Sequence, residues 1–163
     1  MNLKEKLPSL GEIIISETVK DELLEDLEKF EDAKILKENI ENQTINLSKI
    51  KPKNIFKNEN LGKGEKETVE ICIENEGIPI TDDHQALNFS LSFGLKPKTS
   101  EVILLDLFNE SVIDFNHFMK SLRELWRIKS LSPEIVSLFK EKAYKIKKQR
   151  RKNYDKTNES TVR

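Results

Sequence analysis

Apolar residues along the chain recur in two patterns, one typical of buried strands and the other of amphipathic helices. Residues 13–15 form a compact run of three isoleucines, which predicts a short buried strand. Ser16 follows this run and is a residue type that caps helices. The next apolar positions have helical spacing and predict a helix over residues 17–31: Val19, Leu23, Leu27 and Phe30.

The rest of the chain continues this alternation. Short strands are predicted within residues 41–50, at 78–81 and at 112–113, and residues 51–64 have the composition of a loop. Residues 33–40 either extend the first helix or start a second one. Further helices are predicted over residues 65–76, 83–93, from 99 or 100 to 108, 115–127 and 133–149. Strands alternating with helices predict an α/β fold with a parallel sheet.

Length and charge suggest one domain with a basic end. The chain has 163 residues, with 28 Lys and Arg against 29 Asp and Glu. Residues 139–163 hold ten Lys and Arg and only three Asp and Glu, so the preceding part is acidic. We expect a single domain over residues 1–149, followed by a basic, disordered tail over residues 150–163.

Cysteine usage and hydropathy limit the class of protein. Cys72 is the only cysteine, which excludes an intramolecular disulfide framework and fits a reducing, cytoplasmic location. No apolar run approaches the roughly 18 residues of a membrane span, and the N-terminus does not read as a signal peptide. We therefore expect a cytoplasmic protein with no membrane partner.

Acidic residues follow the predicted strands or open the helices between them. Glu22 lies on the flank of the first apolar stripe, Glu65 opens a helix, and Asp82 and Asp83 follow the strand at 78–81. Carboxylates that converge at one sheet edge repel each other unless a proton or a cation intervenes, and oxygen ligands suit Mg²⁺ or Mn²⁺. The alternative is that each acid has an ordinary structural role. The helix dipole then favours Glu65 at a helix start, Glu22 is solvated, and either Asp82 or Asp83 caps a helix.

Three sequence segments resemble the PIN family of nucleases when taken in order. Residues 11–23 resemble its strand and helix with a Glu-Leu pair, here Glu22 and Leu23. Residues 61–69 resemble its Gly-x-Gly-Glu helix start, which ends at Glu65, and residues 78–86 resemble its strand ending in Thr-x-Asp. The resemblance covers roughly residues 5–145.

This resemblance implies a Rossmann-like α/β/α fold and a hydrolase that cleaves RNA with Mg²⁺ or Mn²⁺. Many small members are VapC-like toxins of toxin–antitoxin pairs, which implies an antitoxin partner, and close relatives often form homodimers. Carried over residue by residue, Glu22, Glu65 and Asp83 would be catalytic acids and metal ligands, with Asp82 as the alternative to Asp83.

One part of the family pattern is missing from the printed sequence. PIN domains begin with a strand that carries an Asp, and residues 1–6 contain no such hydrophobic strand. We expect that Met1 is an internal start in a longer frame, that the chain is a decayed copy, or that another chain supplies the strand. We then expect this shortened form not to be fully active and the complete protein to cleave RNA. The alternative function is a non-catalytic module that binds RNA or protein.

Basic residues near the C-terminus form a second candidate site. Positive charge in this arrangement can contact nucleic-acid phosphates, whereas a helix C-terminus alone also favours Lys and Arg. The residues predicted to bind nucleic acid are Lys145, Lys147, Lys148, Arg150, Arg151 and Lys152.

Overall fold

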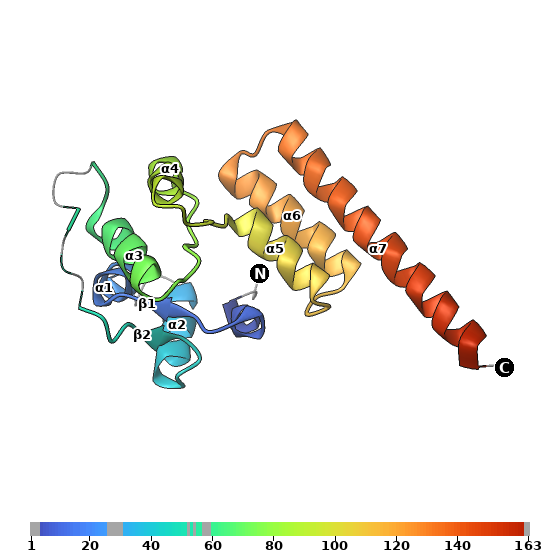
Figure 1. Ribbon diagram of the computed structural model, residues 1–163, viewed down its shortest axis with the longest axis horizontal. Helices are drawn as coiled ribbons and strands as arrows, with labels where there is room; N and C mark the ends of the chain where they lie inside the picture. Colours follow the sequence, from blue (N-terminus) through green and yellow to red (C-terminus); the bar gives the residue numbers. More distant parts are fainter. Residues whose placement is uncertain (1–3, 26–30, 52, 54, 57–59, 162–163) are drawn as a thin grey trace. The chain divides into compact units, whose positions relative to one another are not determined.

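The structure is a computed structural model that describes residues 4–25, 31–51, 53, 55–56 and 60–161. The chain divides into two compact units, one spanning residues 2–100 and the other residues 101–163. Figure 1 shows the order of their elements along the chain. Each unit is considered separately below.

The first unit combines helices with very short parallel strands (Figure 1). A 3₁₀ helix, η1 (Lys4–Leu10), precedes β1 (Ile14–Ile15), which pairs in parallel with β2 (Asn46–Leu47). The helices of this unit are α1 (Glu17–Leu24), α2 (Glu31–Glu41), α3 (Lys63–Glu74) and α4 (His84–Ser92). A separate parallel bridge joins Ile80 to Lys98.

Helix ends in this unit form where the sequence offers capping chemistry. The Ser16 hydroxyl accepts a hydrogen bond from the backbone N–H of Val19, which starts α1 as predicted. Gly94 has a φ of +74° just beyond α4, the left-handed conformation that glycine adopts at little cost. At the end of α3 the left-handed residue is Glu76, with a φ of +52°, and not the glycine that follows it, Gly77.

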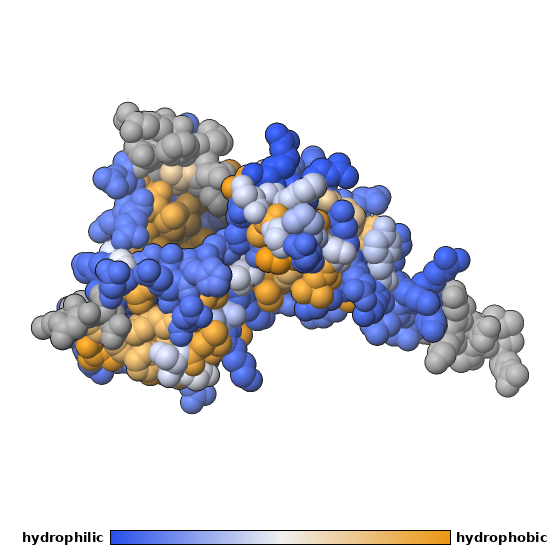
Figure 2. All heavy atoms as spheres, turned by 90° about the horizontal axis from the view of Figure 1, so that it is seen from above, coloured by the Kyte–Doolittle hydropathy of each residue, from blue (hydrophilic) through white to orange (hydrophobic). Residues whose placement is uncertain are grey.

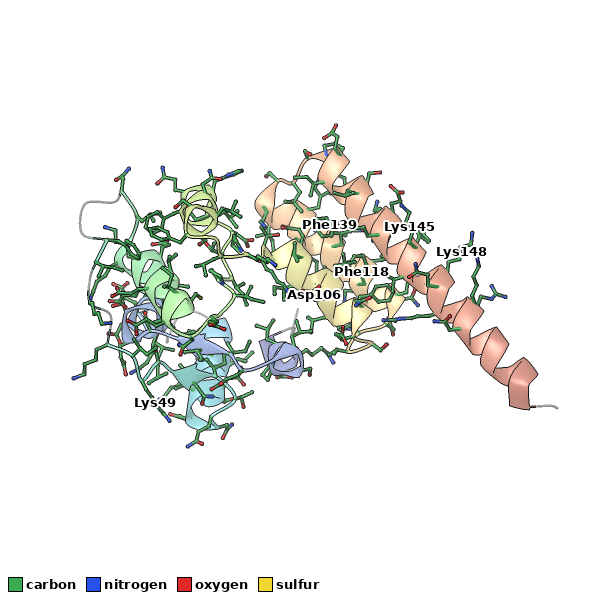
Figure 3. The ribbon with its side chains drawn as sticks, viewed as in Figure 1. Lys49, Asp106, Phe118, Phe139, Lys145 and Lys148 are labelled. Carbon is green, nitrogen blue, oxygen red and sulfur yellow. The ribbon has the colours of Figure 1, made fainter. Side chains whose placement is uncertain are left out.

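The second unit is built from helices that enclose an apolar core. Its elements are α5 (Ser100–Asn109), whose first residue belongs to the preceding unit, α6 (Phe115–Lys129) and α7 (Pro133–Thr161). Figure 3 shows Phe118 and Phe139 between these helices, and both side chains are buried. The following core residues are at most 1% exposed: Leu104, Leu107, Phe108, Phe118, Leu122 and Ala143.

Several predicted elements differ from the structure. Residues 112–113 form no strand, because the N–H groups of Val112 and Ile113 both donate to the Leu107 carbonyl and close the end of α5. The strand predicted at 78–81 is reduced to the bridge at Ile80. The helix predicted over 17–31 ends at Leu24, and residues 26–30, with Leu27 and Phe30, lie outside the described residues.

Helix α7 continues well past the predicted domain end at residue 149. Residues 150–161 are helical in the structure, where composition predicted a disordered tail. The segment contains neither Gly nor Pro after Pro133, so no residue type in it breaks a helix. The prediction of a single domain over residues 1–149 stays a prediction.

The predicted α/β class is confirmed, but the sheet is much smaller than predicted. The chain is mostly helical, with a small two-stranded parallel sheet in the first unit. Among the described residues, no helix combines the length and the hydropathy that crossing a membrane requires.

Candidate functional site

A cavity of about 160 Å³ opens in the first unit at the carboxyl ends of its strand segments. Val19 and Glu22 of α1 line it, together with Gly64 and Glu65 at the start of α3. Pro79, Ile80 and Thr81 line another part of its wall. The structure therefore brings together Glu22 and Glu65, two of the acids predicted from the sequence, although they lie far apart along the chain.

The two glycines before Glu65 make room for these carboxylates. A Cβ atom at Gly64 would lie 2.9 Å from Oε2 of Glu22 and 3.1 Å from Cγ2 of Val19. A Cβ at Gly62 would collide with the Glu65 carboxylate. The Gly-x-Gly-Glu segment thus lets both glutamates lie against the backbone at the N-terminus of α3, where the helix dipole favours negative charge.

Helices α1 and α3 are joined by a polar contact beside the cavity. The Thr18 hydroxyl donates to Oε1 of Glu67 at 2.9 Å, and Glu67 is buried. Nζ of Lys63 lies 3.6 Å from the same Glu67 oxygen. This contact fixes the helices that carry Glu22 and Glu65, and no sequence pattern predicts it.

Thr81 adds a hydroxyl to the wall of the cavity. Its Oγ1 accepts a hydrogen bond of 3.1 Å from the backbone N–H of Asp83. Because the oxygen is engaged as an acceptor, the hydroxyl proton remains available for donation. Thr81 was not among the predicted site residues, although its place at the end of a strand could have suggested it.

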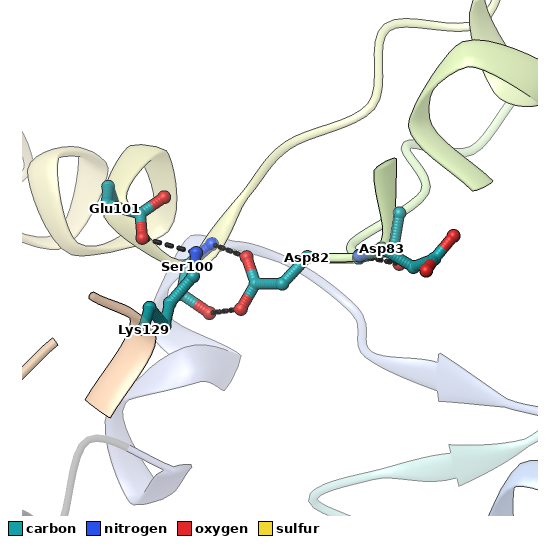
Figure 4. Close-up of polar contacts among 6 residues, drawn as sticks. Asp82, Asp83, Ser100, Glu101 and Lys129 are labelled. Atoms are coloured by element: carbon teal, nitrogen blue, oxygen red, sulfur yellow. Dashed lines mark hydrogen bonds and ion pairs between the residues drawn. The ribbon is translucent and has the colours of Figure 1, made fainter. Parts of the chain in front are cut away.

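Asp82 and Asp83 hold helix starts and do not line the cavity. Oδ1 of Asp83 accepts from the Ala86 N–H at 2.8 Å and caps α4. Asp82 accepts from the N–H and the hydroxyl of Ser100, at 2.9 and 2.5 Å (Figure 4). The alternative interpretation of these residues, as helix caps, therefore describes their contacts in the structure.

The donors at the cavity suit a divalent cation in kind. Glu22 and Glu65 have no hydrogen bond or ion pair with any other residue in the part of the chain that the structure describes. Mg²⁺ prefers hard oxygen ligands, keeps several waters, and often uses only one or two carboxylates. No cluster of three or more His, Cys, Asp or Glu side chains in the described ranges forms a metal site, so the cavity offers two carboxylates.

The basic residues predicted to bind nucleic acid separate into two groups on α7. Lys145 pairs with Glu141 at 2.6 Å, Nζ of Lys147 lies 4.2 Å from the Phe115 ring centroid, and Arg150 donates to the Phe108 and Asn109 carbonyls. The remaining three are exposed: Lys148, Arg151 and Lys152. Figure 2 shows the part of α7 that precedes its grey C-terminal end as hydrophilic, and Figure 3 shows Lys148 on the outer side of α7.

Cys72 does not provide a nucleophile. Its side chain is buried in α3, and burial raises the pKa of the thiol to about 11. A thiol with such a pKa carries almost no thiolate near neutral pH. Cys72 is therefore a core residue of the first unit.

Comparison with known proteins identifies the family of the chain. The sequence model of a family described as PIN domain matches residues 2–144, which covers the first unit and most of the second. No curated protein and no solved structure matches the chain significantly. The chain belongs to the PIN-domain family.

Proposed function

We propose that this protein is a PIN-type ribonuclease that depends on Mg²⁺ or Mn²⁺ and uses the cavity of Glu22 and Glu65. The observation that carries the proposal is that these carboxylates, from α1 and α3, line one cavity without a cationic partner among the described residues. Two like charges in one cavity favour the binding of a cation.

Each residue then has a chemical task. Glu22 and Glu65 would hold the ion, and a bound divalent ion supplies an activated water and charge compensation for a phosphodiester. The oxygen of the Thr81 hydroxyl accepts a hydrogen bond from the Asp83 N–H. The hydroxyl can therefore donate a hydrogen bond to a phosphate oxygen of the substrate. The contact between Thr18 and Glu67 keeps the two carboxylates in place.

Calorimetry with Mn²⁺ tests the metal site directly. Glu22→Gln and Glu65→Gln should each weaken Mn²⁺ binding by at least about tenfold. Loss of a residue that only hydrogen-bonds to a metal ligand already lowers metal affinity by about that factor. Glu25→Gln is the matched control, since Glu25 is an exposed glutamate directly after α1 that does not line the cavity. Wild-type protein without heat of Mn²⁺ binding would refute the proposal.

RNA cleavage is the second readout for the same variants. A labelled single-stranded RNA should be cut by the wild type with Mg²⁺ and by Glu25→Gln, but not by Glu65→Gln. Addition of a chelator should stop the reaction. If the protein bound the metal but did not cut RNA, the metal site would still be supported and the nuclease activity would be contradicted.

We also propose that the protein is a toxin of the VapC-like branch and acts in the cytoplasm. The support for it is the resemblance of residues 11–23, 61–69 and 78–86 to the PIN family, many of whose small members are VapC-like toxins. Such a toxin has an antitoxin protein as partner and often forms a homodimer. Arrest of growth on expression, dependent on Glu65, is the expected result; unimpaired growth with active protein would exclude the toxin role.

A non-catalytic RNA-binding module is the second candidate, and exposed basic residues of α7 favour it. Lys148, Arg151 and Lys152 have i, i+3 and i+4 spacing, so they lie on one face of the helix. Replacing all three with alanine should weaken RNA binding and lower the salt slope by about 2. The control variant replaces exposed Lys120, Arg123 and Arg127 of α6. Equal loss in both variants would exclude a specific α7 site.

A further inference from the structure

Backbone pairing between residues 77–81 and residues 96–98 ends at Pro79. The Lys98 N–H donates to the Pro79 carbonyl at 2.8 Å, and the Lys98 carbonyl accepts from the Thr81 N–H at 3.1 Å. In a parallel pair the next bonds would join Lys96 to the Gly77 carbonyl and to the N–H of residue 79. Proline has no N–H, so the Lys96 carbonyl finds no donor there and the pairing stops.

The backbone groups of Gly77 and Lys96 stay unpaired as a result. Among the described residues, no hydrogen bond engages the Gly77 carbonyl or the N–H and carbonyl of Lys96. Lys96 precedes Pro97, and a residue before proline favours an extended backbone. Backbone groups two residues apart in an extended chain point to the same edge, so those of Lys96 are directed as those of Lys98 are.

A second pocket, of about 340 Å³, lies where this pairing fails. It is lined by Gly77, by Lys96 and by residues at the ends of α3 and α4. Ligand pockets have volumes of roughly 300–1,000 Å³ and mostly apolar walls. No residue of this pocket lines the cavity of Glu22 and Glu65. Its apolar wall consists of Cys72, Ile73, Ile78, Phe93 and Leu95.

Two opposite charges also line the second pocket. They belong to Glu76 and Lys96, and neither side chain has a hydrogen bond or ion pair in the part of the chain that the structure describes. Helices α3 and α4 both end beside the pocket, and the C-terminal end of a helix favours a cation. The pocket therefore offers an anion the N–H and Nζ of Lys96, and it offers a cation the Gly77 carbonyl and the Glu76 carboxylate.

We propose that the second pocket binds a free apolar α-amino acid as its zwitterion. The carboxylate of the ligand accepts from the N–H and Nζ of Lys96, and its ammonium group donates to the Gly77 carbonyl and the Glu76 carboxylate. Its apolar side chain packs on the wall that Ile73 and Phe93 help to form. The ligand thus takes the place of the hydrogen bonds that end at Pro79. The inference is independent of metal binding and RNA cleavage.

Four small probes separate these contacts. L-Phenylalanine carries both charges and a ring, phenylpropionate lacks the ammonium group, phenylethylamine lacks the carboxylate, and glycine lacks the ring. Each is titrated to millimolar concentration into the full chain with a chelator present, and the amide resonances are followed. L-Phenylalanine should shift the resonances of Gly77 and Lys96 to saturation. Each of the other probes should bind at least about tenfold more weakly.

Two protein variants assign the charged contacts. Lys96→Met removes the ammonium group but keeps the backbone N–H, so it should weaken binding of L-phenylalanine and phenylpropionate and leave that of phenylethylamine unchanged. Glu76→Gln should weaken binding of L-phenylalanine and phenylethylamine and leave that of phenylpropionate unchanged. Lys49→Met and Glu25→Gln are the matched controls, because both residues are exposed and neither lines a pocket described here.

Three results would overturn the proposal. They are unchanged Gly77 and Lys96 resonances at millimolar L-phenylalanine, binding of glycine or of a singly charged probe as tight as that of L-phenylalanine, and equal effects of the two variants on every probe. Glu65→Gln should bind L-phenylalanine as the wild type does. Failure here therefore does not bear on the proposed nuclease, and failure of Mn²⁺ binding does not bear on the second pocket.

Discussion

The two units of the chain differ in where the large, fully buried apolar side chains and the cavity lie. In residues 101–163, Leu107 and Phe118 are fully buried, and Phe108 is 1% exposed. In residues 2–100, Ile78 and Ile80 are about half exposed, and Ile80 lines the cavity. The helical unit holds most of the large, fully buried apolar side chains, whereas the unit with strands holds the cavity lined by Glu22 and Glu65. Stability and candidate chemistry thus lie in different parts of the sequence.

The largest expected effect contrasts one apolar side chain from each unit. Phe118→Ala should lower the free energy of unfolding by about 3–5 kcal/mol, because it empties a fully buried site. Ile80→Ala should cost less than about 1 kcal/mol, since Ile80 is 47% exposed. Denaturant unfolding followed by circular dichroism gives both values. Similar losses for the two variants would contradict the contrast between the units.

A buried ion pair within the helical unit provides the next effect. Lys129 of α6 contacts Glu101 of α5, whose side chain is 4% exposed (Figure 4). Lys129→Met should cost about 3 kcal/mol, because the Glu101 charge stays buried without this partner. The double variant Glu101→Leu and Lys129→Met should recover most of the loss. A double variant as unstable as Lys129→Met would show that packing, not charge, dominates.

Asp83 offers a smaller effect that separates helix capping from metal binding. Asp83→Ala should lower stability by about 1 kcal/mol, because the Ala86 N–H loses its acceptor. Asp83→Asn keeps a capping oxygen and should leave stability nearly unchanged. If Asp83 acts only as a cap, Mn²⁺ affinity in calorimetry should also be unchanged in Asp83→Asn. A clear loss of affinity would make Asp83 a metal ligand despite its contacts here.

Much of the helical architecture could be predicted from local signals. Ser16, the Ser132–Pro133 pair and Gly94 mark helix ends in the sequence, and the structure places ends there. The strands were predicted too long, because apolar runs such as residues 78–81 do not reveal whether a neighbouring strand exists to pair with them. Strand pairing depends on distant segments.

The candidate site was predicted only in part, because it too depends on contacts between distant segments. Glu22 and Glu65 meet because glycines precede Glu65, and that motif is local. Asp82 instead contacts Ser100, a partner that sequence spacing gave no reason to expect. The contact between Thr18 and Glu67 is also long-range and has no sequence signal. Residue types predicted the chemistry, but tertiary contacts decided which acids reach the cavity.

The smallest expected change in stability accompanies a large change in function. Gly64→Ala replaces a glycine inside α3, which favours the helix by about 0.5–1 kcal/mol. The new Cβ would meet the Glu22 carboxylate and Val19, so Glu22 must move and Val19 must yield slightly. We expect a net stability change within about 1 kcal/mol and a clear loss of Mn²⁺ affinity in calorimetry.

Gly94→Ala is the matched comparison for Gly64→Ala. Gly94 has a φ of +74° and open space around a Cβ, so alanine there should cost about 1 kcal/mol through backbone strain alone. Because Gly94 does not line the cavity, Mn²⁺ affinity should stay at the wild-type level. One glycine would then serve the helix end and the other the carboxylates. If Gly64→Ala bound Mn²⁺ as well as Gly94→Ala does, the close approach of Glu22 to Gly64 would have no role in the site.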